Sequence, residues 1–321
     1  MVNVNPVDGA KGKITKLKLW KDYLLVFQEK GIARIHYNDQ TTIGSLEGIP
    51  IEILNSSKVS GHNYLSETTG CPNKWSMATS EAGIYFVDNH NSINLFNGNV
   101  NSLSYTKSFK DWSLNNLNAT VWNPYNNGYY GSYDHLHHDY YITNADNCLC
   151  YSEELQAFTS FYDYTKSPIM FNLENKFIGL ESNNGTTKLW SQFEGDDYCN
   201  FYGEQKDYSV EYNVNPEPLN DKVFTNLEYR AYVENTNDTF DKLTVDNEYQ
   251  HGETNINSIS RFKYPNAEKK FRIWRLDIPR DSNSKHKLDR IRNPWIKLKL
   301  IKNTNTHNRI DFHDLIVKYF E

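Results

Sequence analysis

The sequence predicts an all-β protein: a β-propeller-like repeat region followed by an antiparallel β-sandwich domain. Three observations lead to this fold class. A strand–turn–strand unit recurs four times before residue 200, and aromatic residues make up 14% of the chain. No stretch of about twelve residues keeps an apolar 3.6-residue period without Pro, Gly or β-branched interruption. Any helix should therefore be limited to isolated turns.

Each repeat pairs two apolar strands across a short polar turn. The pairs are 23–27 with 32–35, 83–87 with 92–96, 139–143 with 148–151, and 176–180 with 187–190. The turns contain Asn, Asp and Gly, which tolerate the positive φ angles of tight hairpins. Because one hairpin cannot bury its apolar face alone, the copies are expected to stack on one another as the blades of a possibly partial propeller.

At residues 204–207 the short hairpin repeats end, which predicts a boundary between a propeller-like domain, 1–205, and a sandwich domain, 206–321. Longer strands with no convincing helix between them follow, and this pattern favours an antiparallel sandwich. The candidate strands are 208–214, 223–233, 240–248, 269–278, 295–301 and 310–319.

Composition excludes several classes of partner. The net charge of −6 argues against a surface that grips phosphate backbones or anionic lipid, so no specific nucleic-acid binding is expected. The first residues lack a signal-peptide pattern, and no apolar run approaches the length of a membrane span. We expect a soluble protein made in a bacterial host cytoplasm.

The cysteines should be free buried thiols, and they are Cys71, Cys148, Cys150 and Cys199.

Residues 135–139, His-Leu-His-His-Asp, form the only cluster with metal-ligand residue types. On a strand, His135, His137 and Asp139 would point to one face, as ligands of a metal ion do. No fourth ligand is identifiable, so we expect a solvated hairpin edge and no bound metal or other cofactor.

No catalytic residues are predicted, because the common hydrolase, zinc-protease, phosphate-loop and dinucleotide motifs are missing from the sequence. Asp163, Glu181 and Asp196 could supply a carboxylate pair for glycoside hydrolysis, although an acidic β-protein offers such pairs by chance. Residues 194–197 indicate a plain turn and not a calcium loop.

The densest local signal lies in residues 269–281 and 289–295. Alternation places Phe271, Ile273 and Arg275 on one strand face and Arg272, Trp274 and Leu276 on the other, so both faces are expected to be covered. The favoured interpretation is an Arg–Asp network that involves Asp277, Asp281 and Asp289, and the alternative is a basic interface patch. The structural or interface candidates are Trp274, Arg275, Arg280, Asp281, Arg290, Arg292 and Trp295, and both tryptophans are expected to be buried.

These segments, with several upstream ones, resemble the stabilisation or tail-nozzle (muzzle) proteins of crAss-like short-tailed gut phages. The segments that carry the resemblance are 70–76 (Gly-Cys-Pro-Asn-Lys-Trp-Ser), 83–88, 95–98, 151–153, 158–163, 215–218, 221–224, 278–281 (Ile-Pro-Arg-Asp) and 290–295 (Arg-Ile-Arg-Asn-Pro-Trp). Family members usually run longer, so the chain is expected to be a C-terminal portion or a shortened relative.

The resemblance implies a non-enzymatic virion structural protein of the tail. It implies a homo-oligomeric ring, a component of the tail nozzle or stabilisation ring through which the genome exits, in contact with other tail proteins such as adaptor and fibres. The alternative is a carbohydrate-binding or carbohydrate-active β-propeller protein, because exposed Tyr and Trp stack on sugar rings.

Overall fold

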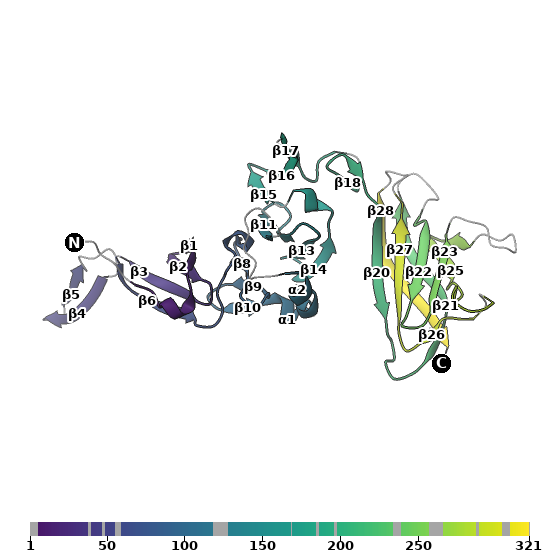
Figure 1. Ribbon diagram of the computed structural model, residues 1–321, viewed down its shortest axis with the longest axis horizontal. Coiled ribbons are helices and arrows are strands. Elements are labelled where there is room, and N and C mark those ends of the chain that lie inside the picture. The colour runs from purple at the N-terminus through teal and green to yellow at the C-terminus, as the bar shows by residue number, and fades with distance from the viewer. Residues whose placement is uncertain are drawn as a thin grey trace. The chain divides into compact units, whose positions relative to one another are not determined.

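The structure is a computed structural model that describes residues 6–320 apart from 38–39, 47–48, 55–58, 118–127, 168, 184–185, 196–197, 234–238, 257–265, 287–288 and 304–308. The chain divides into two compact units, Met1–Glu194 and Gly195–Glu321. Antiparallel strands dominate both units (Figure 1), and the all-β prediction is confirmed. The expected domain boundary after residue 205 stays a prediction, because it concerns whether the two parts of the chain fold independently.

The first unit contains four sheets built mainly from consecutive strands. The first sheet has β1 (Ile14–Trp20), β2 (Tyr23–Gln28), β3 (Ile32–Tyr37) and β6 (Val59–Ser66); the second has β7 (Ala78–Thr79), β8 (Ile84–Val87), β9 (Ile93–Phe96) and β10 (Val100–Ser102). The third has β11 (Tyr130–Asp134), β12 (Asp139–Thr143), β13 (Cys148–Ser152) and β14 (Ala157–Phe161); the fourth has β15 (Ile169–Leu173), β16 (Lys176–Asn183) and β17 (Thr186–Ser191). A separate hairpin pairs β4 (Gln40–Leu46) with β5 (Ile49–Leu54), and the α-helices are α1 (Leu103–Thr106) and α2 (Lys110–Asn116).

The four predicted hairpins are confirmed as the antiparallel pairs β2–β3, β8–β9, β12–β13 and β16–β17. Polar side chains fix the turns between them. The Asp88 carboxylate accepts the backbone N–H groups of His90 at 2.8 Å and Ser92 at 2.9 Å. The Asn144 side chain accepts those of Asp146 and Asn147 in the same way. The Asn and Asp content of these turns thus satisfies local backbone donors.

The four sheets pack face to face in the order of the sequence. Phe27 of the first sheet lies edge-on to Phe86 of the second, with ring centroids 5.6 Å apart. Tyr85 of the second sheet stacks on Tyr140 of the third at 4.6 Å. Tyr141 of the third stacks on Phe177 of the fourth at 5.4 Å. The inner sheets are therefore covered on both faces.

Strand β8 shows how cover on both faces affects the sequence of a strand. All four of its residues are fully buried, because Ile84 and Phe86 belong to the core beside the first sheet, whereas Tyr85 and Val87 belong to the core beside the third. A strand covered on both faces appears in sequence as a continuous apolar run without alternation. Within the described residues the four sheets do not close into a ring, so the propeller itself stays a prediction.

The second unit contains two larger sheets. In one, the strand order is β20 (Tyr208–Val214), β27 (Ile296–Lys302), β22 (Lys242–Asp246), β23 (His251–Asn255). The other has β24 (Ala267–Lys270), β25 (Ile273–Asp277) and β21 (Lys222–Val233), with β26 (Arg292–Asn293) and β28 (Ile310–Phe320) also paired to β21. The short strands β18 (Asn200–Phe201) and β19 (Glu204–Gln205) precede them.

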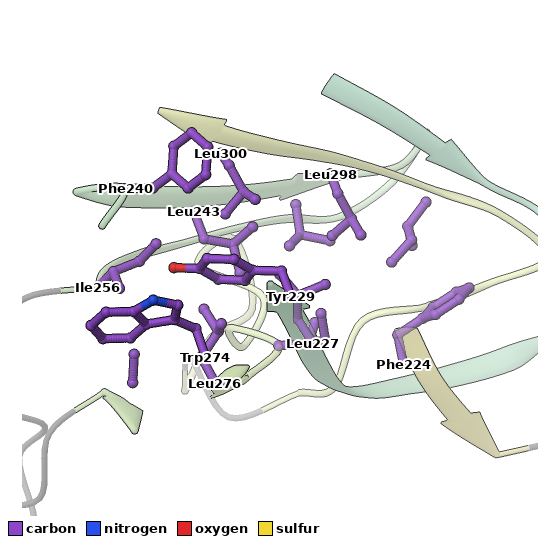
Figure 2. Close-up of a cluster of buried hydrophobic side chains, with 14 of the residues drawn as sticks. Phe224, Leu227, Tyr229, Phe240, Leu243, Ile256, Trp274, Leu276, Leu298 and Leu300 are labelled. Carbon is purple, nitrogen blue, oxygen red and sulfur yellow. The ribbon is translucent and has the colours of Figure 1, made fainter. Parts of the chain in front are cut away.

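The two larger sheets share one hydrophobic core, which is the arrangement of a β-sandwich. Figure 2 shows Tyr229 of β21 at its centre, between Leu243 and the Leu227 and Leu276 side chains, with Trp274 beside Ile256. Strand β27 alternates strictly, with Ile296, Leu298 and Leu300 buried and the lysines between them facing outward. Burying each such leucine contributes about 1.5–3 kcal/mol.

One predicted strand is wrong. Residues 269–278 form a hairpin of β24 and β25, and the turn at Phe271 and Arg272 has positive φ at both positions, 51° and 66°. Neither residue type signals such a turn, for which Asn-Gly is the usual choice. Trp274 and Leu276 face the core, whereas the Arg275 side chain is 48% exposed. The prediction that both faces of this strand are covered is therefore also wrong.

No helix in the described part of the chain is long and apolar enough to cross a bilayer.

Candidate interface surfaces

The two tryptophans singled out from the sequence have different environments. Trp274 is 6% exposed and lies in the core of the second unit, where the Lys269 ammonium lies 5.2 Å from its ring centroid. Trp295 is only half-buried, just before β27, and borders a hollow on the surface. The expectation of burial holds for Trp274 and is wrong for Trp295.

The arginine partners also differ from the expected ones. Arg275 Nε lies 3.1 Å from Glu228 Oε1, and Arg292 Nε lies 3.8 Å from Asp221 Oδ2. Lys318 also binds Glu228, at 2.6 Å, and its hydrogen bond, assisted by Arg275, lowers the pKa of that carboxyl. The predicted network with Asp277, Asp281 and Asp289 is therefore wrong for these two arginines. The side chains of Arg280 and Arg290 are exposed, and an interface role for them stays a prediction.

Asp281 is 7% exposed and holds a loop together through backbone donors. Its carboxylate accepts the N–H of Asn283 at 2.9 Å and that of His251 at 3.4 Å, and its own N–H donates to the Asp289 carbonyl. Gln250 extends this loop network by accepting the Arg292 N–H at 2.6 Å. Asp281 thus shapes the segment that presents the exposed arginines.

Residues 135–138 form the turn between β11 and β12, and Asp139 begins β12, so the predicted strand that places His135, His137 and Asp139 on one face is wrong. His137 Nδ1 lies 2.7 Å from Asp134 Oδ2, and His138 Nδ1 lies 3.3 Å from the Tyr133 hydroxyl. Across the residues that the structure describes, no group of three His, Cys, Asp or Glu side chains could hold a metal ion.

Of the three carboxylates that could supply a pair for glycoside hydrolysis, two lie among the described residues. Glu181 on β16 accepts a hydrogen bond from Trp190 Nε1 at 2.7 Å. Asp163 precedes a short 3₁₀ turn at Tyr164–Lys166. Asp196, and with it part of the turn predicted at 194–197, lies outside the described residues.

The four cysteines form no disulfide bonds, as expected. Burial raises the pKa of the Cys71, Cys148 and Cys150 thiols to about 12, so these three are neutral packing groups at physiological pH. Cys199 is only half-buried, in contrast to the expectation.

An apolar surface that the sequence did not single out lies on the outer side of the first sheet. Leu17 and Leu19 of β1 are 57% and 61% exposed. They pair in register with Val26 and Leu24 of β2, and alternation puts these four side chains on the face opposite the Phe27 core. On this face Val26 is fully buried and Leu24 is half-buried. We call Leu17, Leu19 and Leu24 the first end face.

The fourth sheet carries a matching surface. Ile169, Phe171 and Leu173 of β15 are 42%, 39% and 56% exposed, although all three are apolar. Ile169 pairs with Leu180, which pairs with Leu189 at 64% exposure, so one apolar row crosses all three strands. We call Ile169, Phe171, Leu173, Leu180 and Leu189 the second end face. Contiguous exposed apolar surface of this kind marks sites of association.

A stack of β-sheets with an apolar face at each end is typical of a structural protein that assembles with others. Comparison with known proteins agrees: the sequence model described as "Crassvirus muzzle protein" matches residues 1–184, and that described as "Crassvirus muzzle protein C-terminal domain" matches residues 196–281. A protein named "Muzzle protein" from Bacteroides phage crAss001 is 44% identical over 323 residues, which cover 98% of this chain and 23% of that protein.

The chain therefore belongs to the muzzle protein family of crAss-like phages, and the resemblance inferred from its sequence is confirmed. It spans about a quarter of the length of the curated relative that it matches.

Proposed function

We propose that the chain is a non-enzymatic structural protein of the phage virion and part of the tail nozzle or stabilisation ring through which the genome leaves. Membership of the muzzle family supports a place in the virion. The observation that carries the assembly role is the pair of end faces, which leave leucines such as Leu19 and Leu189 more than half exposed at both ends of the stack.

The proposed architecture is a β-propeller in which the four sheets of the first unit are consecutive blades. Sheets of sequential antiparallel strands that pack face to face are the building units of propellers. The second and third sheets have a neighbour on each face, whereas the first and fourth sheets have an apolar face available. Further β-sheets of muzzle protein would cover both end faces, and contacts between copies would build the homo-oligomeric ring.

The location in the virion is tested by labelling intact phage particles with gold-conjugated antibody raised against residues 195–321. We expect the label at the end of the tail farthest from the capsid, and the chain should be detected by mass spectrometry of purified particles. Label on the capsid, or particles that lack the protein, would overturn the proposal.

The role of the end faces is tested by sedimentation velocity. The parent chain should self-associate at high micromolar concentration, and Leu19→Lys or Leu189→Lys should weaken the association because each places a charge in an apolar contact. Leu155→Lys is the matched control, since Leu155 is 71% exposed but belongs to neither end face. A parent chain that stays monomeric, or three variants that behave alike, would count against the assembly role.

A further inference from the structure

A hollow of about 520 Å³ lies on the second unit and plays no part in the proposed assembly. Its lining residues are Asn213, Asn215, Asp246, Asn247, Trp295 and Lys297. This volume lies within the roughly 300–1,000 Å³ range of small-molecule sites. Five of the six lining side chains are polar, and the remaining one is a half-buried tryptophan.

The register of the sheet places these side chains together. Asn213 of β20 and Asp246 of β22 both lie directly opposite Lys297 of β27. The flanking residues Ile296 and Leu298 are fully buried, so Lys297 and its two neighbours project from the outer face. Trp295 precedes Lys297 by two residues, Asn215 follows Asn213 by two residues, and both line the hollow beside them. The hollow is thus a polar platform with an aromatic ring at one end.

The charged side chains of this platform already have partners. Lys297 Nζ lies 3.5 Å from Glu211 Oε1, and Asp246 Oδ1 lies 2.5 Å from His251 Nδ1. An anionic ligand such as a nucleotide would need cations that are not already paired. A purely apolar ligand would leave the amide, carboxylate and ammonium groups of the lining without hydrogen-bond partners. The composition instead suits an uncharged ligand with many hydroxyl groups.

Three hydrogen bonds give the platform a fixed shape. The Asn247 side-chain oxygen accepts the backbone N–H groups of Tyr249 at 2.9 Å and Gln250 at 2.8 Å, which sets the β22–β23 turn. The Trp295 backbone N–H donates to Asn293 Oδ1 at 3.2 Å, which anchors the tryptophan. The amides of Asn213 and Asn215 are exposed and offer both donors and acceptors to a ligand.

We propose that this hollow binds a neutral sugar ring of a glycan. The Trp295 indole would stack on the apolar face of the ring, and the amides of Asn213 and Asn215 would hydrogen-bond its hydroxyls, with Lys297 and Asp246 as further partners. The virion protein would then contact a polysaccharide through its second unit, independently of the end faces of the first unit.

The test is saturation-transfer difference NMR on the full chain with maltohexaose, cellohexaose, mannohexaose and chitohexaose, and with a heparin hexasaccharide as anionic probe. We expect at least one neutral oligosaccharide to bind with a Kd on the order of 1 mM, as suits a shallow site that holds about one sugar ring. Trp295→Ala should weaken this binding by roughly tenfold.

Asn213→Ala should weaken binding severalfold without disturbing the core, because Asn213 is exposed. Ser209→Ala is its matched control: Ser209 lies on the same strand and the same face, is also exposed, and does not line the hollow. Binding of heparin alone, no binding of any neutral probe, or equal binding by the parent and by the Asn213 and Trp295 variants would overturn the inference. None of these results would bear on the location of the chain in the virion.

Discussion

The two units bury their apolar side chains in different ways. In the first unit the core is divided between successive sheets, and an inner strand such as β8 contributes side chains to both faces. In the second unit two sheets enclose one core, and a strand such as β27 contributes only alternate residues to it. A stack of sheets leaves an apolar face at each end, whereas the two sheets of a sandwich cover each other's inner faces. Further sheets would therefore extend the first unit, as we propose, whereas the core of the second unit is closed by its own two sheets.

The largest effect is expected from Trp274→Ala. Truncating a buried aromatic side chain in the single core of the second unit should lower its free energy of unfolding by about 3–5 kcal/mol. Thermal melting followed by circular dichroism measures the loss. Trp295→Ala is the control, and it should cost clearly less because Trp295 is half-buried.

Limited proteolysis of the parent and of Trp274→Ala tests the proposed domain boundary. The parent should yield a stable fragment from about residue 207 to 321, and Trp274→Ala should remove that fragment while sparing the first unit. If no such fragment appears from the parent, the boundary after residue 205 is wrong.

Gly131→Ala should disrupt the contact between β11 of the third sheet and the 3₁₀ turn Lys74–Ser76, which precedes the second sheet. A Cβ atom at Gly131 would overlap the Ser76 carbonyl oxygen, which already accepts a hydrogen bond from the Tyr140 hydroxyl at 2.6 Å. We expect a loss of about 1–3 kcal/mol, measured by urea denaturation. Gly61→Ala is the matched control, since a Cβ atom there meets nothing within 4 Å. Equal losses in both variants would contradict the close packing at Gly131.

Alkaline pH should destabilise the first unit more than the second. Burial raises the pKa of Cys71, Cys148 and Cys150 from 9.0 to about 12, so from pH 9 to pH 12 the unfolded state releases these protons before the folded state does. The stability that neutral thiols provide is complete below pH 9 and is lost as pH rises to about 12, by roughly 1 kcal/mol per thiol at pH 10.

Denaturation curves of the parent and of Cys150→Ala at pH 8 and pH 10 measure this pH-dependent loss of stability. The variant should lose less stability over the interval than the parent does. An identical pH dependence in the two proteins would show that the Cys150 thiol does not contribute.

The smallest effect is expected for the binding of duplex DNA. A conduit for a genome should not hold it, and a chain with a net charge of −6 should show no measurable duplex affinity at physiological salt, where ordinary non-specific binders reach roughly 10⁻⁴ to 10⁻⁶ M. Fluorescence anisotropy with a labelled duplex measures this. Saturable micromolar binding that weakens steeply with added salt would reveal a basic face and contradict the passive-conduit role.

Much of the fold could be predicted because its signals are local. The β8–β9 hairpin is specified by a run of apolar residues and by Asp88, whose carboxylate satisfies the turn amides. The β24–β25 turn could not be predicted, because Phe271 and Arg272 adopt positive φ without the residue types that favour it. The half-buried position of Trp295 could not be predicted for another reason: a tryptophan beside a strand has the same sequence pattern whether it faces a core or a surface hollow.

The sequence by itself determined the all-β class, the four hairpins, the free cysteines and the family, since each depends on residue types at short spacing. Only the tertiary structure decided which sheet faces have a neighbour. Leu17 and Leu25 are equally apolar, yet one is 57% exposed and the other fully buried, because Leu25 faces the core that the first sheet shares with the second. The hollow around Trp295 has the same origin, since it brings together residues of β20, β22 and β27 that only strand pairing makes neighbours.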